Sequence, residues 1–215
     1  MNTEMTEVSR KLNYSNVDPD VVFRLAWYVV ASKPNLILEE HSEAESQDFK
    51  GSAKFSLRIA GEEAHAAIQV TKAQSAVELS AQGHDEIALS VYVDDHIQAM
   101  DSTLSKYQAL SEEDKAKLKK ALVAKTCWDR VVKEILAKAP LSDVYVQVAH
   151  GREMMIKATE GEESIPSATL TTAAWLTKIE SLPRDETMPG NIASELAKKS
   201  IEWKRETQNI ISRYI

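Results

Sequence analysis

The sequence has little cysteine and little glycine, and each shortage excludes a kind of chemistry. Cys127 is the only cysteine among 215 residues, which excludes an intrachain disulfide, a CxxC redox pair and a cysteine-based zinc site. The six glycines stand apart from one another, so no GxGxxG, GxxxxGK or GxSxG string occurs. Phosphate-cradling loops need glycine where the backbone approaches the anion. Rossmann dehydrogenases, P-loop NTPases and α/β-hydrolases are therefore not expected.

Long apolar runs are also missing. No stretch approaches the roughly 18 apolar residues that cross a bilayer, and residues 1–12 lack the apolar core of a secretory signal. With the lone cysteine, these features predict a cytoplasmic protein that does not engage a membrane. Hydrophobic residues still make up 43% of the chain, which is typical of a folded protein and excludes an intrinsically disordered one.

Positive charge is scarce in the first half of the chain. Residues 1–100 contain 8 basic and 16 acidic side chains, and the whole chain has a net charge of −7. A field of this sign repels a phosphate backbone, so nucleic-acid binding is not expected. The one basic concentration lies on a predicted helix and is interpreted as its solvated face: Lys115, Lys117, Lys119, Lys120 and Lys125.

The spacing of apolar residues predicts an α+β fold. Helical spacing covers residues 18–33, where Asp18 suits the N-cap and Pro19 the first helical position. Period-2 alternation predicts a four-stranded meander over residues 52–94 and a hairpin over residues 143–158. The expected sheet is mostly antiparallel, has about five to seven strands and is covered by helices. The alanine-rich stretch at residues 62–81 fits a helix as well as strands.

Further helices and the domain organisation follow from caps and breakers. Ser111 suits the N-cap of a helix that ends before Pro140. Two more helices are predicted at about 167–181 and from about 190 to the end of the chain. The turn-rich segment at residues 182–190 marks the best boundary, so we expect one α+β domain over 1–182 and a C-terminal helical arm over 183–215. The acidic stretch at residues 39–46 is expected to be a loop.

A short string near the middle of the chain carries a weak resemblance. Residues 91–96 have the sequence Val-Tyr-Val-Asp-Asp-His, and four of them resemble the catalytic turn of retroelement reverse transcriptases, where paired aspartates hold metal ions. A polymerase also needs a further aspartate on a neighbouring strand and a basic fingers region, and neither is visible. The interpretation is that a strand ends at Asp94 and that Asp94 or Asp95 caps a helix beginning near His96.

The remaining chemistry-bearing residues form no site pattern. The five histidines are scattered, with no HExxH and no HxH pair. Cys127 would be a nucleophile only if the fold brought His150 to it as a base, whereas a free cysteine within a helix is more typical of a small buried residue. No catalytic residue, cofactor or metal site is predicted, and the balance leans against an enzyme.

The end of the chain is unusually apolar for a terminus. It predicts either a helix that closes the core or an amphipathic surface that docks on another subunit or partner. The residues proposed for that interface are Trp203, Ile210, Ile211, Tyr214 and Ile215.

Three functional hypotheses remain. The first is a non-enzymatic protein–protein interaction or assembly module, such as a structural subunit, adaptor or inhibitor from a virus or mobile element, with a protein partner and homo-oligomerisation expected. The second is a small-ligand-binding protein or enzyme with a pocket between the meander and the helix at 18–33, using Asp94, Asp95, His96 and His150. The third is an acidic inhibitor that mimics nucleic acid.

Overall fold

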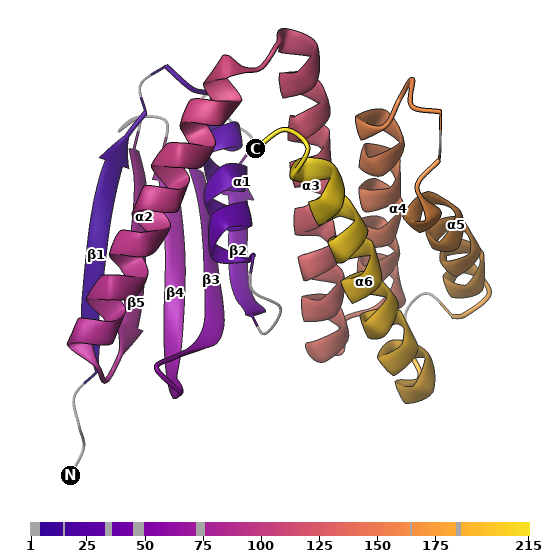
Figure 1. Cartoon of the computed structure of the whole chain (residues 1–215). Coiled ribbons are helices and arrows are strands. Elements are labelled where there is room, and N and C mark those ends of the chain that lie inside the picture. Colours follow the sequence, from indigo (N-terminus) through magenta and orange to yellow (C-terminus); the bar gives the residue numbers. More distant parts are fainter. Residues whose placement is uncertain are drawn as a thin grey trace. The chain divides into compact units, whose positions relative to one another are not determined.

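The computed structural model describes residues 5–14, 16–32, 36–44, 50–71, 76–163, 165–183 and 186–215. The chain divides into two compact units, residues 1–108 and 109–215, which are described separately below (Figure 1). The first unit contains the sheet, and the second consists of helices. The predicted α+β class is confirmed.

The first unit is built on one antiparallel sheet of five strands in the order β1-β5-β4-β3-β2. The strands are β1 (Thr6–Asn13), β2 (Ile37–Ala44), β3 (Lys50–Ile59), β4 (Glu62–Thr71) and β5 (Ala76–Gly83). β2 to β5 form a meander, and β1 lies beside β5 at one edge. One face of β4 is buried through Ala64, Ala66, Ile68 and Val70, which alternate with exposed or half-buried residues. This alternation is typical of a sheet that has one face against a core.

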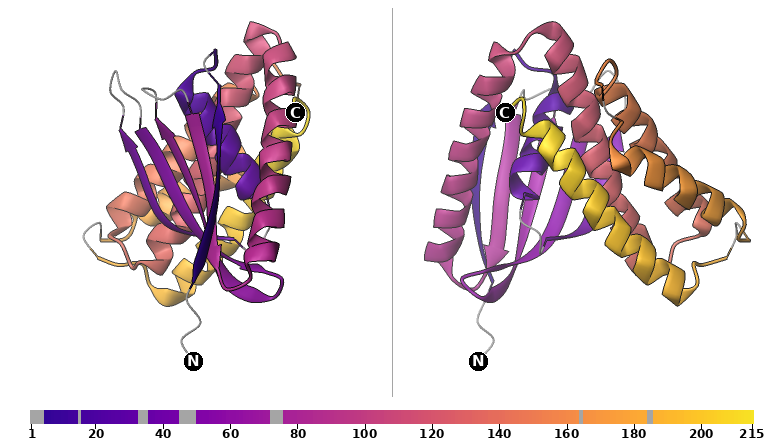
Figure 2. Two further views of the ribbon diagram at one scale, coloured as in Figure 1. Left: turned by 90° about the vertical axis from the view of Figure 1, so that its left-hand side faces the viewer. Right: turned by 45° about the vertical axis from the view of Figure 1, so that its right-hand side comes forward.

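Two helices cover the same face of this sheet: α1 (Pro19–Val30) and α2 (Glu86–Ala109) (Figures 1 and 2). α1 begins as predicted, because the Asp18 carboxylate accepts a hydrogen bond from the backbone N–H of Asp20 at 3.1 Å. It is apolar almost all round and packs its aromatic side chains into the sheet. Trp27 meets Phe23 and Phe55 edge-to-face, with ring centroids 5.6 and 5.4 Å apart.

The start of α2 corrects the predicted meander. Residues 86–94 are helical, not a fourth strand, and the helix begins ten residues earlier than His96. Asp85 is its cap, since its carboxylate accepts from the Ala88 N–H at 3.0 Å and its carbonyl from the Leu89 N–H. Apolar residues alternate from Ile87 to Val93, which favours a strand. The buried side chains recur at helical spacing instead: Leu89, Tyr92, Val93, His96 and Met100.

Two edge strands also depart from expectation. Residues 39–44 continue β2 instead of forming a loop, because the strand is an edge whose glutamates reach solvent, Arg24 or His65. β1 has no counterpart among the predicted strands. The alanine-rich stretch at 62–81 forms β4 and most of β5. Residues 45–46 of the predicted loop and 184–185 of the predicted boundary lie outside the described residues.

The second unit contains α3 (Glu112–Leu136), α4 (Leu141–Ala158), α5 (Ser167–Glu180) and α6 (Gly190–Ile211). Ser111 caps α3 as predicted, and its hydroxyl accepts from the Asp114 N–H at 3.1 Å. α3 packs against α4 and α6, and α5 packs against both α4 and α6. Trp128 and Trp203 meet in the core with ring centroids 5.3 Å apart.

The predicted hairpin at 143–158 is wrong, because this segment is α4. Its buried residues Leu141, Val144, Val148, Gly151, Met155 and Ala158 recur at helical spacing, whereas Val146 is exposed. Gly151 is needed for packing, since a Cβ there would lie 2.5 Å from the ring of Trp128. The valine run 144–148 therefore alternates by coincidence.

The organisation into domains stays a prediction. The expected boundary at 182/183 falls between α5 and α6, inside the second unit, whereas the division by compactness lies at 108/109. Within the described ranges, no helix has a stretch long and apolar enough to cross a membrane.

Candidate functional site

The helix α2 is fastened to the edge strand β1 by polar side chains. Arg10 donates from Nε to Asp94 Oδ1 at 2.9 Å and from Nη2 to Ser90 Oγ at 3.4 Å. Directly after β1, the Tyr14 hydroxyl donates to Asp101 Oδ1 at 2.6 Å. Burial, this hydrogen bond and the charge of Asp101 all raise the pKa of Tyr14 above its ordinary value. α2 therefore lies along β1 and β5 in a fixed orientation.

Two apolar side chains on α2 remain exposed near this edge. Ile87 is 78% exposed and Val91 is 56% exposed, and they are one helical turn apart. Ile87 precedes Ser90 by three residues and Asp94 by seven, so it belongs to the helix face that meets Arg10 of β1. We call the outer edge of β1 together with Ile87 and Val91 the β1–α2 rim.

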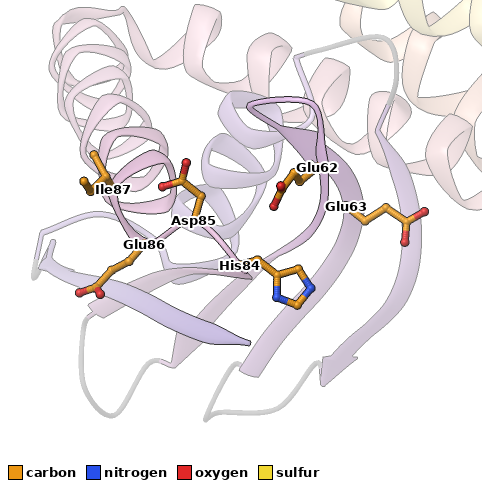
Figure 3. Close-up of a pocket in the computed structure, with 6 residues that line it drawn as sticks. All are labelled: Glu62, Glu63, His84, Asp85, Glu86 and Ile87. Carbon is orange, nitrogen blue, oxygen red and sulfur yellow. The ribbon is translucent and has the colours of Figure 1, made fainter. Parts of the chain in front are cut away.

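An open hollow of about 840 Å³ lies at the end of the sheet where β5 leads into α2 (Figure 3). Its lining is mostly acidic: Glu62, Glu63, His84, Asp85, Glu86 and Ile87. Such a lining attracts cations, but Asp85 is already engaged as the cap of α2. Among the described residues no group of three or more histidine, cysteine or carboxylate side chains is placed to hold a metal ion. The hollow is therefore described as a polar surface at the end of the sheet.

The pocket predicted between the meander and the helix at 18–33 stays a prediction. Among the described residues, the space between α1, β5 and α2 amounts to about 10 Å³, lined by Ala26, Val29, Val30, Val77, Leu79, His96, Ile97 and Met100. That is barely room for one water molecule, whereas small-molecule sites occupy about 300–1,000 Å³. This part of the interface between α1 and the sheet is therefore closely packed.

The four residues proposed for that pocket have other roles. Asp94 pairs with Arg10, and Asp95 is exposed in the middle of α2, so neither caps a helix. His96 is buried, with Nδ1 2.7 Å from the Tyr92 carbonyl oxygen and its ring 4.0 Å from that of Tyr92. His150 is exposed on α4 of the second unit. Three of the four residues thus lie on α2 of the first unit and one on α4 of the second.

Cys127 lies on α3 and is buried within the second unit. His150, its proposed base, is exposed on α4. A substrate has no route to the thiol in this arrangement, since the side chain is enclosed by the helices around it. The interpretation of Cys127 as a small buried residue is confirmed.

The proposed C-terminal interface residues divide into two groups. Trp203, Ile210 and Ile211 are buried in the core of the second unit, where Trp203 packs on Trp128. Tyr214 and Ile215 follow α6 and are half-buried. The structure therefore gives the first three a place in the core, which was the alternative to docking. A contact of any of the five with a partner stays a prediction.

The basic residues of α3 are not one solvated face. Lys115 and Lys117 pair with Glu112 and Glu113 at the start of the helix, each at 2.8 Å. Lys125 is only 1% exposed and lies 3.7 Å from Asp129. The prediction that Lys125 belongs to the solvated face is thus wrong, because its side chain is buried beside Asp129, which Lys204 of α6 also reaches.

Sequence analysis missed the β1–α2 rim. The signal for β1 was short, with Val8 and Leu12 separated by charged residues, and an edge strand needs no continuous apolar pattern. Ile87 and Val91 were assigned to a buried strand, although their spacing of four residues also fits one face of a helix.

Comparisons with protein-family models, with curated proteins and with solved structures each find no match for this chain. Its function is therefore argued from the residues and their geometry alone.

Proposed function

We propose that the chain is a non-enzymatic assembly module that associates with protein, in the first place with further copies of itself. One observation carries the proposal: exposed Ile87 and Val91 stand one turn apart on α2, beside the edge strand β1. Exposed apolar side chains next to an open sheet edge are the two features that drive association between folded chains. The filled interior between α1, β5 and α2 gives no comparable support to a ligand-binding role.

The choice of surface differs from the one proposed on α6. In α6 the largest apolar side chains are enclosed by the unit itself, so their burial on association would first require the unit to open. At the β1–α2 rim the apolar side chains are already at the surface. Burying one such side chain contributes about 1.5–3 kcal/mol, without a cost of local unfolding.

The solution mass tests the proposal. Light scattering on the full chain, measured over a range of concentrations and salts, should give a mass that rises above the 24.0 kDa of one chain. The double variant Ile87→Ser, Val91→Ser should stay at the mass of one chain. A matched control, Leu170→Ser with Ile201→Ser, removes two similarly exposed apolar side chains from α5 and α6 and should behave as the wild type.

Either of two results would contradict the proposal. A mass of one chain for the wild type at every concentration would exclude self-assembly. An enzymatic activity retained by the double variant and independent of association would exclude the non-enzymatic role.

A further inference from the structure

The two edges of the sheet are built differently. β2 carries Glu39, Glu40 and Glu43 and its pairing with β3 is interrupted by a register shift between Leu38 and Glu40. Bulges are devices that prevent a sheet edge from pairing with another chain. β1 pairs with β5 through all its residues in one unbroken register. Figure 2 (left) looks onto this edge, with no other element of the first unit in front of it.

The sequence of β1 complements itself when two copies run antiparallel. Arg10 reaches α2, so the alternation of a strand places Glu7, Ser9 and Lys11 together on the opposite face, where all three are exposed. If Ser9 lies opposite Ser9 of a second copy, Glu7 lies opposite Lys11 of that copy, and the pair occurs twice. Directly opposite charges of unlike sign stabilise a strand pair, whereas like charges destabilise it.

Neighbouring registers are less favourable. If Arg10 lies opposite Arg10 of the second copy, so that the two-fold axis of the dimer passes between them, two guanidinium groups face each other. If Val8 lies opposite Val8 of the second copy, only the five residues from Thr6 to Arg10 are paired. In the Ser9 register, the seven residues from Thr6 to Leu12 are paired. A shift by one residue would turn the helices of the two copies to opposite faces of the joined sheet. Among the registers that keep both helices on one face, the Ser9 register therefore pairs more residues than the Val8 register and, unlike the Arg10 register, has matched charges.

The exposed side chains of α2 fit the same arrangement. α2 lies over β1 and β5, since it contacts Arg10 of β1 and encloses Val77 and Leu79 of β5. Adjacent strands are about 4.8 Å apart, and packed helices are about 8–10 Å apart. Two copies of α2 on the same face of a joined sheet are thus within packing range. The sides of the helices that face each other would include Ile87, which lies next to Ser90 and Asp94 on the side toward β1.

We infer that β1 is the self-association surface, at which a second copy adds its own β1 antiparallel with Ser9 opposite Ser9. The two five-stranded sheets then form one continuous sheet, with both α2 helices on one face. This inference rests on the proposed function, and it names the surface and the register by which the chain would assemble.

A charge exchange tests the register. Glu7→Lys alone places like charges opposite each other twice and should raise the dissociation constant about tenfold. Lys11 lies opposite Glu78 within its own chain, so the two are exchanged together: Lys11→Glu with Glu78→Lys keeps the unlike pair within the chain and should also raise the constant about tenfold. Adding Glu7→Lys to these two substitutions restores both unlike pairs between the copies and should recover the wild-type constant. Glu62→Lys is the control, because it makes the same change of charge on an exposed residue of β4 that lies opposite Ile59. Sedimentation equilibrium on the full chain measures all five proteins.

A cross-link tests the axis independently of affinity. Directly opposite residues of antiparallel strands have Cα atoms about 4.5–5.5 Å apart, which suits a disulfide. Ser9→Cys should therefore give an oxidised dimer on a non-reducing gel. Asn13→Cys, at the exposed end of β1, should give none, since it lies four residues from the axis in each copy. The native Cys127 is buried and serves as the background in both variants.

The outcomes separate this inference from the proposed function. An oligomer that ignores the Glu7 and Lys11 exchanges, or cross-links equally through both cysteines, overturns the β1 register and leaves assembly standing. A wild type that has the mass of one chain at every concentration overturns both.

Discussion

The interiors of the two units differ in the polar side chains that they bury. In the described part of the first unit these are Arg24 and His96, whereas the second unit buries a longer series: Lys125, Thr126, Asp129, Thr159, Thr169, Thr172, Ser200 and Thr207. Apart from Thr169, whose buried Oγ1 has no hydrogen-bond partner among the described residues, the hydroxyl groups of this series donate to backbone carbonyls of their own helices. Thr207, for example, donates to the Trp203 carbonyl oxygen at 2.8 Å and Ser200 to that of Leu196 at 2.9 Å. Such local hydrogen bonds lower the free-energy cost of burying a hydroxyl group.

Threonine hydroxyls also accept hydrogen bonds from the indole N–H groups of the two tryptophans. The indole N–H of Trp128 donates to Thr207 Oγ1 at 2.9 Å, and that of Trp203 to Thr171 Oγ1 at 2.8 Å. A buried indole needs such an acceptor. The helical unit therefore accommodates two large aromatic side chains by placing a threonine beside each indole N–H, Thr207 in the core and Thr171 at the exposed side of α5, whereas Trp27 of the first unit is surrounded by aromatic edges.

The charged groups of the two interiors have opposite arrangements. In the first unit one cation meets two anions, because Arg24 lies 2.9 Å from Asp20 and 3.1 Å from Glu43. In the second unit one anion meets two cations, with Asp129 lying 3.7 Å from Lys125 and 2.5 Å from Lys204. Removing the central group leaves two like charges facing each other. The cost should be larger where those charges are more deeply buried.

The largest effect is therefore expected for Asp129→Ala. It leaves Lys125 enclosed without its carboxylate, and we expect the free energy of unfolding of the second unit to fall by about 3–5 kcal/mol. Arg24→Met in the first unit should cost less, about 1–2 kcal/mol, since Asp20 and Glu43 are partly exposed. Hydrogen exchange resolves the loss unit by unit. Equal losses would show that the depth of burial does not decide the cost of removing the central ion of each group.

Two glycines allow a comparison of packing. A Cβ on Gly151 would lie 2.5 Å from the Trp128 ring, and one on Gly51 would lie 2.8 Å from the ring of Phe23. Gly151→Ala and Gly51→Ala should each destabilise their own unit by about 1–3 kcal/mol through overpacking, with the larger loss at Gly151. Gly190→Ala has open space around it and is the control. Thermal unfolding of all three measures the order, and a neutral Gly151→Ala would contradict the α3–α4 packing.

The pH dependence of stability distinguishes the buried lysine from the arginine. Burial lowers the pKa of Lys125 to about 8, although Asp129 opposes the shift; an exposed lysine has a pKa of about 10.4. Between these values the unfolded chain holds a proton that the native chain has released. Lys125 therefore makes the free energy of unfolding rise as the pH increases from about 8 to 10.

Lys125→Met removes that dependence. At pH 7 the variant should equal the wild type or exceed it by about 1 kcal/mol, because an apolar side chain replaces a buried charge and Asp129 keeps Lys204. Urea unfolding at pH 7, 8, 9 and 10 should show the wild type gaining stability relative to the variant as the pH rises. A constant difference would mean that Lys125 keeps its proton throughout this range.

How much the sequence predicts depends on where the informative residues lie. Caps are local, so the starts of α1 at Asp18 and α3 at Ser111 could be predicted. The valines of α4 alternate by chance, and only the packing of Gly151 on Trp128, 23 positions earlier, identifies the helix. Lys125 belonged to a basic run in the sequence, and its burial depends on Asp129 and on Lys204 of another helix. The rim at β1 likewise depends on a strand order that no local pattern encodes.

The smallest effects are expected at two non-glycine residues, one in the described part of each unit, that lie in the left-handed backbone region. Ala60, with φ of 51°, precedes Gly61 in the β3–β4 turn, and Lys138, with φ of 54°, follows the C-cap of α3. The Ala139 N–H bonds the Glu134 carbonyl and the Lys138 N–H bonds that of Ile135, the pattern of a Schellman motif, in which glycine is preferred at the position of Lys138. Asn-Gly is likewise the preferred pair in a two-residue turn of this kind.

Ala60→Asn and Lys138→Gly should each raise the free energy of unfolding of their own unit by about 0.5 kcal/mol, detected by hydrogen exchange. If Lys138→Gly also protected the first unit, the two units would unfold as one cooperative body, and their interiors could no longer be compared as independent cores.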